Sequence, residues 1–373
     1  MAAACAFAIA GLYYNQPLLP LISLTFGTGD YVTSLVVTLG QLGYALGLLL
    51  FVPIGDRFDR KRLILILLLT NTAGLAACAF APSFTLFALA TFVAGITTVT
   101  PQIIIPTLTG NAAPQQRGRT VGILMGGMSL GLLLGRTLSG VVGDMAGWRS
   151  VFAFAMVSNF LLVAVVWRYL PFTAPTPDLS YLRLMRSLWK LFTGQPVLRA
   201  ACATGFLAFA ASSAIWATLA SLLSQAPYHL GANIAGMFGL VGIASMFAAP
   251  LMGRITDRFG ARAMIGLWSM AGTIAFVFVA FAGSALWALI LGVALIDIGY
   301  RGVLIANQTR IYPLQAGAHS RLNTIFMTCV FLGGAAGSAC GAAAAAHWSW
   351  TGLALAGGGF AALGFMVSMR RPS

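Results

Sequence analysis

The stretch Gly55-Asp56-Arg57-Phe58 recurs in part as Thr256-Asp257-Arg258-Phe259, at an offset of 201 positions from Asp56 to Asp257. A second set of residues repeats at an offset of 202 positions: Arg119, Gly131, Gly135 and Trp148 match Arg321, Gly333, Gly337 and Trp350. Glycine is common in this chain, but Asp, Arg and Trp are rare. Their agreement on nearly one offset indicates an internal repeat, so we predict two halves of the same architecture.

The chain on both sides of these stretches is too apolar to form a surface in water. Of its 373 residues, 59% are hydrophobic and 8% are charged, against roughly 45–50% and 25% in ordinary globular proteins. The mean hydropathy is +0.91. The lipid bilayer is therefore the predicted surrounding of most of the chain, which makes it an integral membrane protein.

Twelve runs are long and apolar enough to span a bilayer, for which a helix needs about 20 such residues. They lie at 3–24, 33–54, 63–81, 84–108, 119–142, 150–169, 200–224, 233–252, 263–283, 285–312, 322–346 and 352–369. We therefore predict an all-α fold of twelve transmembrane helices in two six-helix repeats. The N-terminal half is 1–170, a cytoplasmic linker is 171–198 and the C-terminal half is 199–373.

The linker contains a stretch, 179–192, with apolar and basic residues at helical spacing. Leu182, Met185, Trp189 and Phe192 would share one face of a helix, and Arg183, Arg186 and Lys190 another. Such a pattern is typical of a helix that rests on a membrane surface, but a solvated linker is equally consistent with it.

Lys and Arg alternate between loops in a way that predicts orientation. They are concentrated in every second gap and at the C-terminus, whereas the opposite loops contain only Arg149. Positively charged loops stay in the cytoplasm. Both termini are therefore expected in the cytoplasm of a cell whose inner membrane the protein spans, and topology alone explains the net charge of +14.

The composition also argues against several functions. All seven acids are Asp, the three His are scattered, and the five Cys lie in apolar runs, so neither a metal site nor a cofactor is expected. The basic residues form no stripe with interleaved aromatics, so no nucleic-acid partner is expected. The sequence contains no Gly-x-x-x-x-Gly-Lys-Ser/Thr motif and no ordered catalytic triad, so we do not expect an enzyme.

The two repeated loops carry a signature. Residues 253–262 keep a Gly-x-x-x-Asp-Arg-x-Gly frame, and residues 55–62 carry its Asp-Arg, with Val52 and Asp59 in place of the two Gly. These loops resemble the loop signature of the major facilitator superfamily. The resemblance implies a twelve-helix transporter whose gating loops contain Asp56, Arg57, Asp257 and Arg258.

Repeat symmetry suggests what these loops contact. Asp56 is expected near Arg321 and the start of run 322–346, and Asp257 near Arg119 and the start of run 119–142. A helix N-terminus stabilises a nearby carboxylate by about 0.3–1 kcal/mol. Loops that only set the topology would explain the Arg residues but not the repeated Asp.

Further stretches resemble the bacterial drug:proton antiporters of the arabinose- and sugar-efflux type. They are Tyr13-Tyr14-Asn15-Gln16-Pro17-Leu18-Leu19-Pro20, Arg117-Gly118-Arg119-Thr120-Val121-Gly122, Leu134-Gly135-Arg136, Gly147-Trp148-Arg149, Asn307-Gln308-Thr309-Arg310 and Arg321-Leu322-Asn323-Thr324. The resemblance covers nearly the whole chain. Gly126, Gly135 and Gly140 fit the antiporter signature of the fifth span, whereas Arg136 replaces its Pro and Thr91 stands near the place of the family's Arg in the fourth span.

Charged residues at membrane depth are candidate functional residues. Asp297 and Arg301 are four positions apart, with Gln308 on the same stripe; a proton-coupling pair and a purely structural ion pair are both open. The resemblance implies a central cavity lined by the first, fourth, seventh and tenth spans, which adds Tyr14, Gln16, Thr98, Gln102, Phe209, Ser213 and Trp216. Arg136 is expected to reach the membrane interface or Asp144.

The function expected from these features is secondary transport of a small organic solute, such as a drug, sugar or aromatic compound, by a monomer. The resemblance implies efflux in exchange for protons. Uptake by proton symport, facilitated diffusion, a channel and a membrane-embedded enzyme are the alternatives, of which the channel is disfavoured because paired gating loops suit alternating access.

Overall fold

The computed structural model describes residues 1–55, 57–111, 113, 116–170, 172, 180–315 and 318–370. The first half contains α1 (Ala2–Ala10), α2 (Asn15–Phe26), α3 (Asp30–Ile54), α4 (Arg60–Ala79), α5 (Phe84–Thr97), α6 (Thr100–Asn111), α7 (Arg117–Ala146) and α8 (Trp148–Tyr169). After α9 (Tyr181–Gly194) come α10 (Pro196–Ser224), α11 (Ala232–Met237), the 3₁₀ turn η2 (Phe238–Val241), α12 (Gly242–Phe259), α13 (Ala261–Ala280), α14 (Leu286–Ile311), η3 (Tyr312–Leu314) and α15 (His319–Met369). The all-α fold is confirmed.

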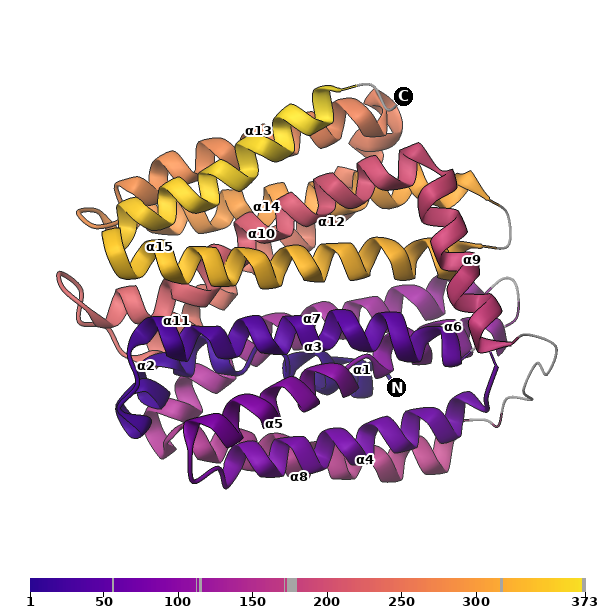
Figure 1. Ribbon diagram of the computed structural model, residues 1–373, viewed down its shortest axis with the longest axis horizontal. Helices are drawn as coiled ribbons and strands as arrows, with labels where there is room; N and C mark the ends of the chain where they lie inside the picture. The colour runs from indigo at the N-terminus through magenta and orange to yellow at the C-terminus, as the bar shows by residue number, and fades with distance from the viewer. Residues whose placement is uncertain are drawn as a thin grey trace.

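Eleven segments in the described part of the chain are long and apolar enough to cross a membrane. The last, α15, has 51 residues, which would make a rod of about 77 Å at 1.5 Å per residue. Its backbone leaves the helical region at Trp348 and Ser349, and Figure 1 shows it doubling back as two rods. The segment therefore supplies the last two of the twelve predicted spans.

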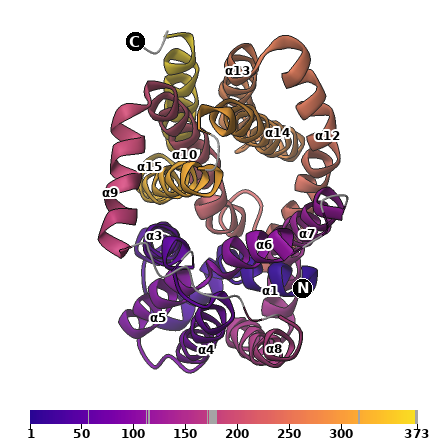
Figure 2. The same ribbon diagram turned by 90° about the vertical axis from the view of Figure 1, so that its right-hand side faces the viewer.

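The helices form two bundles. Figure 2 shows α1 to α8 gathered on one side and α10 to α15 on the other. We retain 1–170, 171–198 and 199–373 as the proposed division of the chain; Pro171 and 173–179 lie outside the described residues.

Helix α9 lies across the ends of both bundles, at what we call the linker end (Figure 1). The Tyr181 hydroxyl donates to Leu50 O of α3 at 3.4 Å, and Arg321 of α15 donates to Ser187 Oγ at 3.3 Å. The face buried against the protein is Leu184, Leu188 and Leu191. Of the predicted apolar face, Leu182 and Trp189 are 77% and 67% exposed, whereas Met185 and Phe192 pack partly against the core. Whether this face rests on a membrane stays a prediction.

The repeated glycines mark the same helix crossing in both halves. A Cβ on Gly131 of α7 would overlap Ala6 O of α1, and a Cβ on Gly333 of α15 would overlap Phe206 O of α10. Gly337 is equally close to Ala210 O. Only glycine permits this approach of two backbones, as at small-residue crossings of membrane helices generally. The internal repeat is therefore confirmed at the level of packing.

The turn before each repeated Trp also has a common geometry. Gly147 has φ +80° before Trp148, and Ser349, 202 positions later, has φ +49° before Trp350. Both Trp side chains are buried. A positive φ suits glycine but strains serine; the second half nevertheless makes the same sharp turn, because its last two spans must also pack antiparallel.

We expect Gly337→Ala to destabilise the protein. The added methyl group would have to displace the backbone at Ala210, and overpacking of this kind costs about 1–3 kcal/mol. Thermal unfolding in detergent measures the effect. Gly359→Ala is the matched control, because a Cβ there meets nothing within 4 Å; equal unfolding temperatures for the two variants would contradict the proposed packing.

Three spans are interrupted part-way along their length. The first span changes from α1 to α2 through a turn at 11–14, the fourth from α5 to α6 at 98–99, and the eighth through η2. Interrupted helices at membrane depth are tolerated where they line a cavity or a site. The first and the last of these interruptions adjoin the polar cluster described next, through Tyr13 and Gly239 beside Arg136.

Candidate functional site

Arg136 of α7 is the centre of a polar cluster between the two halves. Its side chain is 4% exposed. Its Nε donates to Gln16 Oε1 at 2.7 Å, and its Cζ lies 3.7 Å from the ring centroid of Trp216 and 4.8 Å from that of Tyr13. The prediction that Arg136 reaches the membrane interface or Asp144 is wrong, because an indole from the other half holds the guanidinium inside the protein.

Asp297 of α14 lies beside the same indole. Trp216 Nε1 donates to Asp297 Oδ1 at 3.2 Å, and the carboxylate is 6% exposed. A Cβ on Gly242 would lie 2.9 Å from Asp297 Oδ2, so the glycine after η2 leaves room for the carboxylate. The other Asp residues that the structure describes lie at helix ends: Asp30, Asp59, Asp144 and Asp257.

Arg301 lies one turn after Asp297 and is only partly buried. The predicted ion pair between them is absent: among the described residues no nitrogen of Arg301 comes within 4.0 Å of the carboxylate. Asp297 turns to the Trp216 N–H instead. Arg301 still lies beside the cluster, because it follows Tyr300, whose ring stacks on Phe209.

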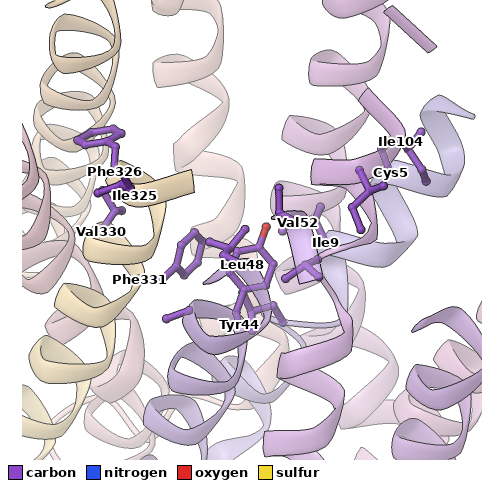
Figure 3. Close-up of a cluster of buried hydrophobic side chains, with 14 of the residues drawn as sticks. Cys5, Ile9, Tyr44, Leu48, Val52, Ile104, Ile325, Phe326, Val330 and Phe331 are labelled. Atoms are coloured by element: carbon purple, nitrogen blue, oxygen red, sulfur yellow. The ribbon is translucent and has the colours of Figure 1, made fainter. Parts of the chain in front are cut away.

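Aromatic rings extend the cluster toward the linker end. Phe209 stacks on Tyr300 at a centroid distance of 4.8 Å and meets Phe331 at 5.1 Å. Phe331 in turn meets Tyr44 of α3 at 4.3 Å, and Figure 3 shows these two rings facing each other between the halves. The rings thus join α3, α10, α14 and α15.

Two amides add hydrogen bonds to this layer. Gln102 Nε2 donates to the Tyr44 hydroxyl at 3.3 Å, and Gln41 Nε2 donates to Ser213 Oγ at 3.2 Å across the halves. The structure therefore brings together seven of the predicted residues: Gln16, Gln102, Phe209, Ser213, Trp216, Asp297 and Arg301. Their roles stay a proposal.

Five members of the cluster were missed by the sequence analysis: Tyr13, Gln41, Tyr44, Tyr300 and Phe331. Gln41 and Tyr44 are three positions apart within an otherwise apolar run, and this pair of polar groups at helical spacing was the available signal. Tyr13 adjoins a predicted residue, and Tyr300 adjoins Arg301. Nothing in the sequence distinguishes Phe331 from other core phenylalanines.

Three predicted residues lie elsewhere. Tyr14 packs in the core of the first half with Leu18 and Phe87. Thr98 Oγ1 accepts from Asn71 Nδ2 at 3.1 Å in the same half. Gln308 Nε2 donates to Asn323 Oδ1 at 3.4 Å, two turns past Arg301 toward the linker end. The structure does not bring these three residues to Arg136.

Glycines on α7 show how the two halves separate. Near its C-terminal end, a Cβ on Gly140 would overlap Ala232 O of α11, and Gly236 of α11 lies against Gly140 and Arg136. Gly135 packs on Ala10 of α1. Toward the linker end, Cβ atoms on Gly118, Gly122 and Gly126 would meet nothing within 4 Å. Contact between α7 and the eighth span is therefore made away from the linker end.

The expected contact of Asp257 with Arg119 is absent in this conformation. Both side chains are exposed at the linker end, where α12 and α7 are apart, and within the described ranges no ion pair joins them. Arg57 and Arg258 lie over the rings of Phe58 and Phe259 at 5.5 and 5.3 Å, a further sign of the repeat. Asp56 lies outside the described residues, so its predicted contact with Arg321 is untested.

A small cavity adjoins the cluster. Its wall combines Gln16, Arg136 and Trp216 with the apolar side chains of Pro17, Leu219, Ala220 and Ala235. The cavity thus lies between the two halves, on the side of Trp216 that faces away from the linker end. Two further small cavities lie inside the second and first halves respectively.

Two repeated bundles, interrupted spans and a charged cluster between the bundles define a secondary transporter. Such a protein opens the same site alternately to either side of the membrane. The model of the Major Facilitator Superfamily matches residues 1–309 and 202–373. The chain belongs to this superfamily, and it is a multi-pass membrane transporter and not an enzyme.

Relatives cover almost the full length of the chain. It is 36% identical over 370 residues to the "Uncharacterized transporter YgaY" of Escherichia coli O157:H7, covering 99% of this chain and 94% of that protein. It is 23% identical over 372 residues to the "Probable sugar efflux transporter" of Pasteurella multocida, covering 97% and 90%. A solved bacterial homolog of the human lysosomal transporter Spinster, inward-facing and unoccupied, shares the fold with a TM-score of 0.77 at 16% identity, covering 98% and 95%.

Proposed function

We propose that this transporter exports a small organic solute across the bacterial inner membrane in exchange for protons, with its solute site at Arg136, Trp216 and Asp297. The observation that carries the proposal is the chain of contacts from Gln16 through Arg136 and Trp216 to Asp297. This chain joins both halves at mid-membrane and ends on a carboxylate that can take up a proton. The Pasteurella relative named for sugar efflux supports the outward direction.

Proton coupling would act through the charge of Asp297. The ionised carboxylate accepts the Trp216 N–H and so fixes the indole on which Arg136 lies. A proton on Asp297 removes that charge and weakens the hydrogen bond. The Arg136–Trp216 contact crosses between the halves, so protonation would change the relative free energy of the two access states.

Proteoliposomes that contain the purified protein and a pH-sensitive dye test the proposal. We expect at least one solute of a panel of sugars, drugs and aromatic compounds to exchange, with protons moving opposite to the solute. Protons moving with the solute would indicate symport, and exchange without proton movement would indicate facilitated diffusion. A steady ion current without exchange would indicate a channel.

We further propose that both termini are cytoplasmic. A reporter active only in the cytoplasm should work when fused to the C-terminus and fail when inserted beside Gly283, because the charge bias of the loops places these sites on opposite sides. Reporter activity in cells measures this. Activity at both sites, or the reverse pattern, would contradict the proposed topology.

The gating loops belong to the same proposal. With the linker end closed, α12 would approach α7, and Asp257 could then reach the helix N-terminus beside Arg119. We expect Asp257→Asn to lower the rate of solute exchange more than it lowers the amount of protein in the membrane. Asp144→Asn, an exposed carboxylate at the other end of α7, is the control. Normal exchange by Asp257→Asn would rule out this role.

A further inference from the structure

The guanidinium of Arg136 is buried with most of its hydrogen-bonding capacity unused. Arginine has five N–H donors. Across the described ranges the only hydrogen-bond acceptor of Arg136 is Gln16 Oε1, which accepts from Nε. The Nη groups therefore have no protein acceptor there, although the side chain is 4% exposed. The rings of Trp216 and Tyr13 contact the guanidinium but accept no conventional hydrogen bond from its Nη atoms. Neither Nη atom is among the fully buried atoms without a partner, so both are accessible from the cavity that Arg136 lines. A complementary acceptor is therefore expected at this position.

The charges around Arg136 do not supply that group. Asp297 contacts the edge of Trp216 and Arg136 its face, and within the described part of the chain no ion pair joins Asp297 to either arginine. Arg301, one helical turn after Asp297, adds a second positive charge. The cluster therefore contains two arginines and one carboxylate, and it has a net charge of about +1 when Asp297 is ionised.

The adjoining cavity indicates what kind of molecule brings the missing negative charge. Arg136, Gln16 and Trp216 lie in its wall. The remaining wall is apolar, from Pro17, Leu219, Ala220 and Ala235. A ligand with an acid group at one end and a compact apolar or aromatic body would satisfy both parts, because a carboxylate pairs with a guanidinium through charge-assisted hydrogen bonds.

We propose that the transported solute is an organic anion, a carboxylate with a compact apolar or aromatic body, whose acid group binds the Nη groups of Arg136. The inference rests on the solute site of the proposed function but not on its proton coupling. A cationic drug would meet Arg136 and Arg301 with like charge, and a neutral sugar would leave the guanidinium uncompensated.

Three small probes of nearly identical shape separate charge from fit: benzoate, benzamide and benzamidinium. Calorimetric titration of the full-length protein in detergent should give benzoate a dissociation constant at least about tenfold lower than that of benzamide, because benzoate forms an ion pair with the guanidinium whereas benzamide offers only a neutral acceptor. Benzamidinium should bind most weakly. Benzoate binding that is absent at millimolar concentration, or no tighter than that of benzamide, would overturn the inference.

Variants of Arg136 test whether this residue causes the preference for benzoate. In Arg136→Gln the dissociation constants of benzoate and benzamide should become equal within about twofold, and Arg136→Lys should restore part of the preference for benzoate. A benzoate preference that survives in Arg136→Gln would overturn the assignment to Arg136. If Arg136→Gln does not fold, the three-probe comparison on the unaltered protein decides alone.

The outcome is separable from that of the proton assay. Preferential benzoate binding without solute-driven proton movement supports the anion site and rejects proton exchange. Proton movement driven by a neutral sugar, together with equal binding of benzoate and benzamide, supports proton exchange and rejects the anion site.

Discussion

Asp297→Asn is expected to abolish pH-gradient-driven transport while solute exchange at equal pH stays measurable. Asn keeps an oxygen that can accept the Trp216 N–H, at present 3.2 Å from Asp297 Oδ1, so the cluster keeps its shape. It cannot gain or lose a proton. The variant thus separates the shape of the site from its charge, and solute counterflow in proteoliposomes, with and without a pH gradient, measures both.

Asp144→Asn is the matched control, because it makes the same substitution on an exposed carboxylate at the end of α7. It should respond to the gradient as the unaltered protein does. If Asp297→Asn keeps full gradient-driven transport, Asp297 has a structural role only. In that case the coupling group lies elsewhere or transport is facilitated diffusion.

The spans and the repeat could be predicted from the sequence because both depend on local composition. Bilayer thickness fixes the length of an apolar run, and the close helix crossings require glycine at corresponding positions, as at Gly131 and Gly333. These constraints act within one segment or one pair of segments. They can therefore be recognised in the sequence as apolar runs of a certain length and as glycines at repeated spacing.

The side chains of the site were harder to predict, because an interrupted helix changes which face points inward. The turn at 11–14 is held by hydrogen bonds to the third preceding residue, such as Tyr13 N to Ala10 O at 2.9 Å. Such a turn rotates the helix relative to an α-helical continuation. Tyr13 therefore reaches Arg136, and Tyr14 turns into the first half.

Contacts between the halves were not predictable from spacing at all. Arg301 is at the ideal distance in sequence to pair with Asp297, yet the carboxylate accepts from Trp216 of a different helix. Arg136 likewise has a partner, Trp216, that lies 80 positions away in the other half. Tertiary packing decides which of two available partners a side chain contacts. Residue spacing in a single sequence does not indicate which one it is.

Gly140→Leu is expected to lower solute exchange at least about fivefold without unfolding either half. Gly140 lies where α7 crosses α11, and a Cβ there would overlap Ala232 O and lie 2.9 Å from Gly236 Cα. Inserting a side chain at such a contact costs about 1–3 kcal/mol, which is about a tenfold change for every 1.4 kcal/mol. Because the contact lies between the halves, this free energy should oppose the present conformation and not the fold of either bundle.

Accessibility reports whether the equilibrium has moved in this way. In a protein whose five native Cys have been replaced, Ala220→Cys places a thiol in the wall of the central cavity. Gly140→Leu should increase labelling of this thiol by a membrane-impermeant maleimide added on the side away from the linker end. The reason is that the leucine side chain separates α7 from α11 there. Gly359→Leu, where a Cβ meets nothing within 4 Å, should leave labelling and exchange unchanged. Unchanged labelling in Gly140→Leu together with normal exchange would mean that the crossing of α7 and α11 stays closed throughout transport, and the two halves would then have to open along another pair of helices.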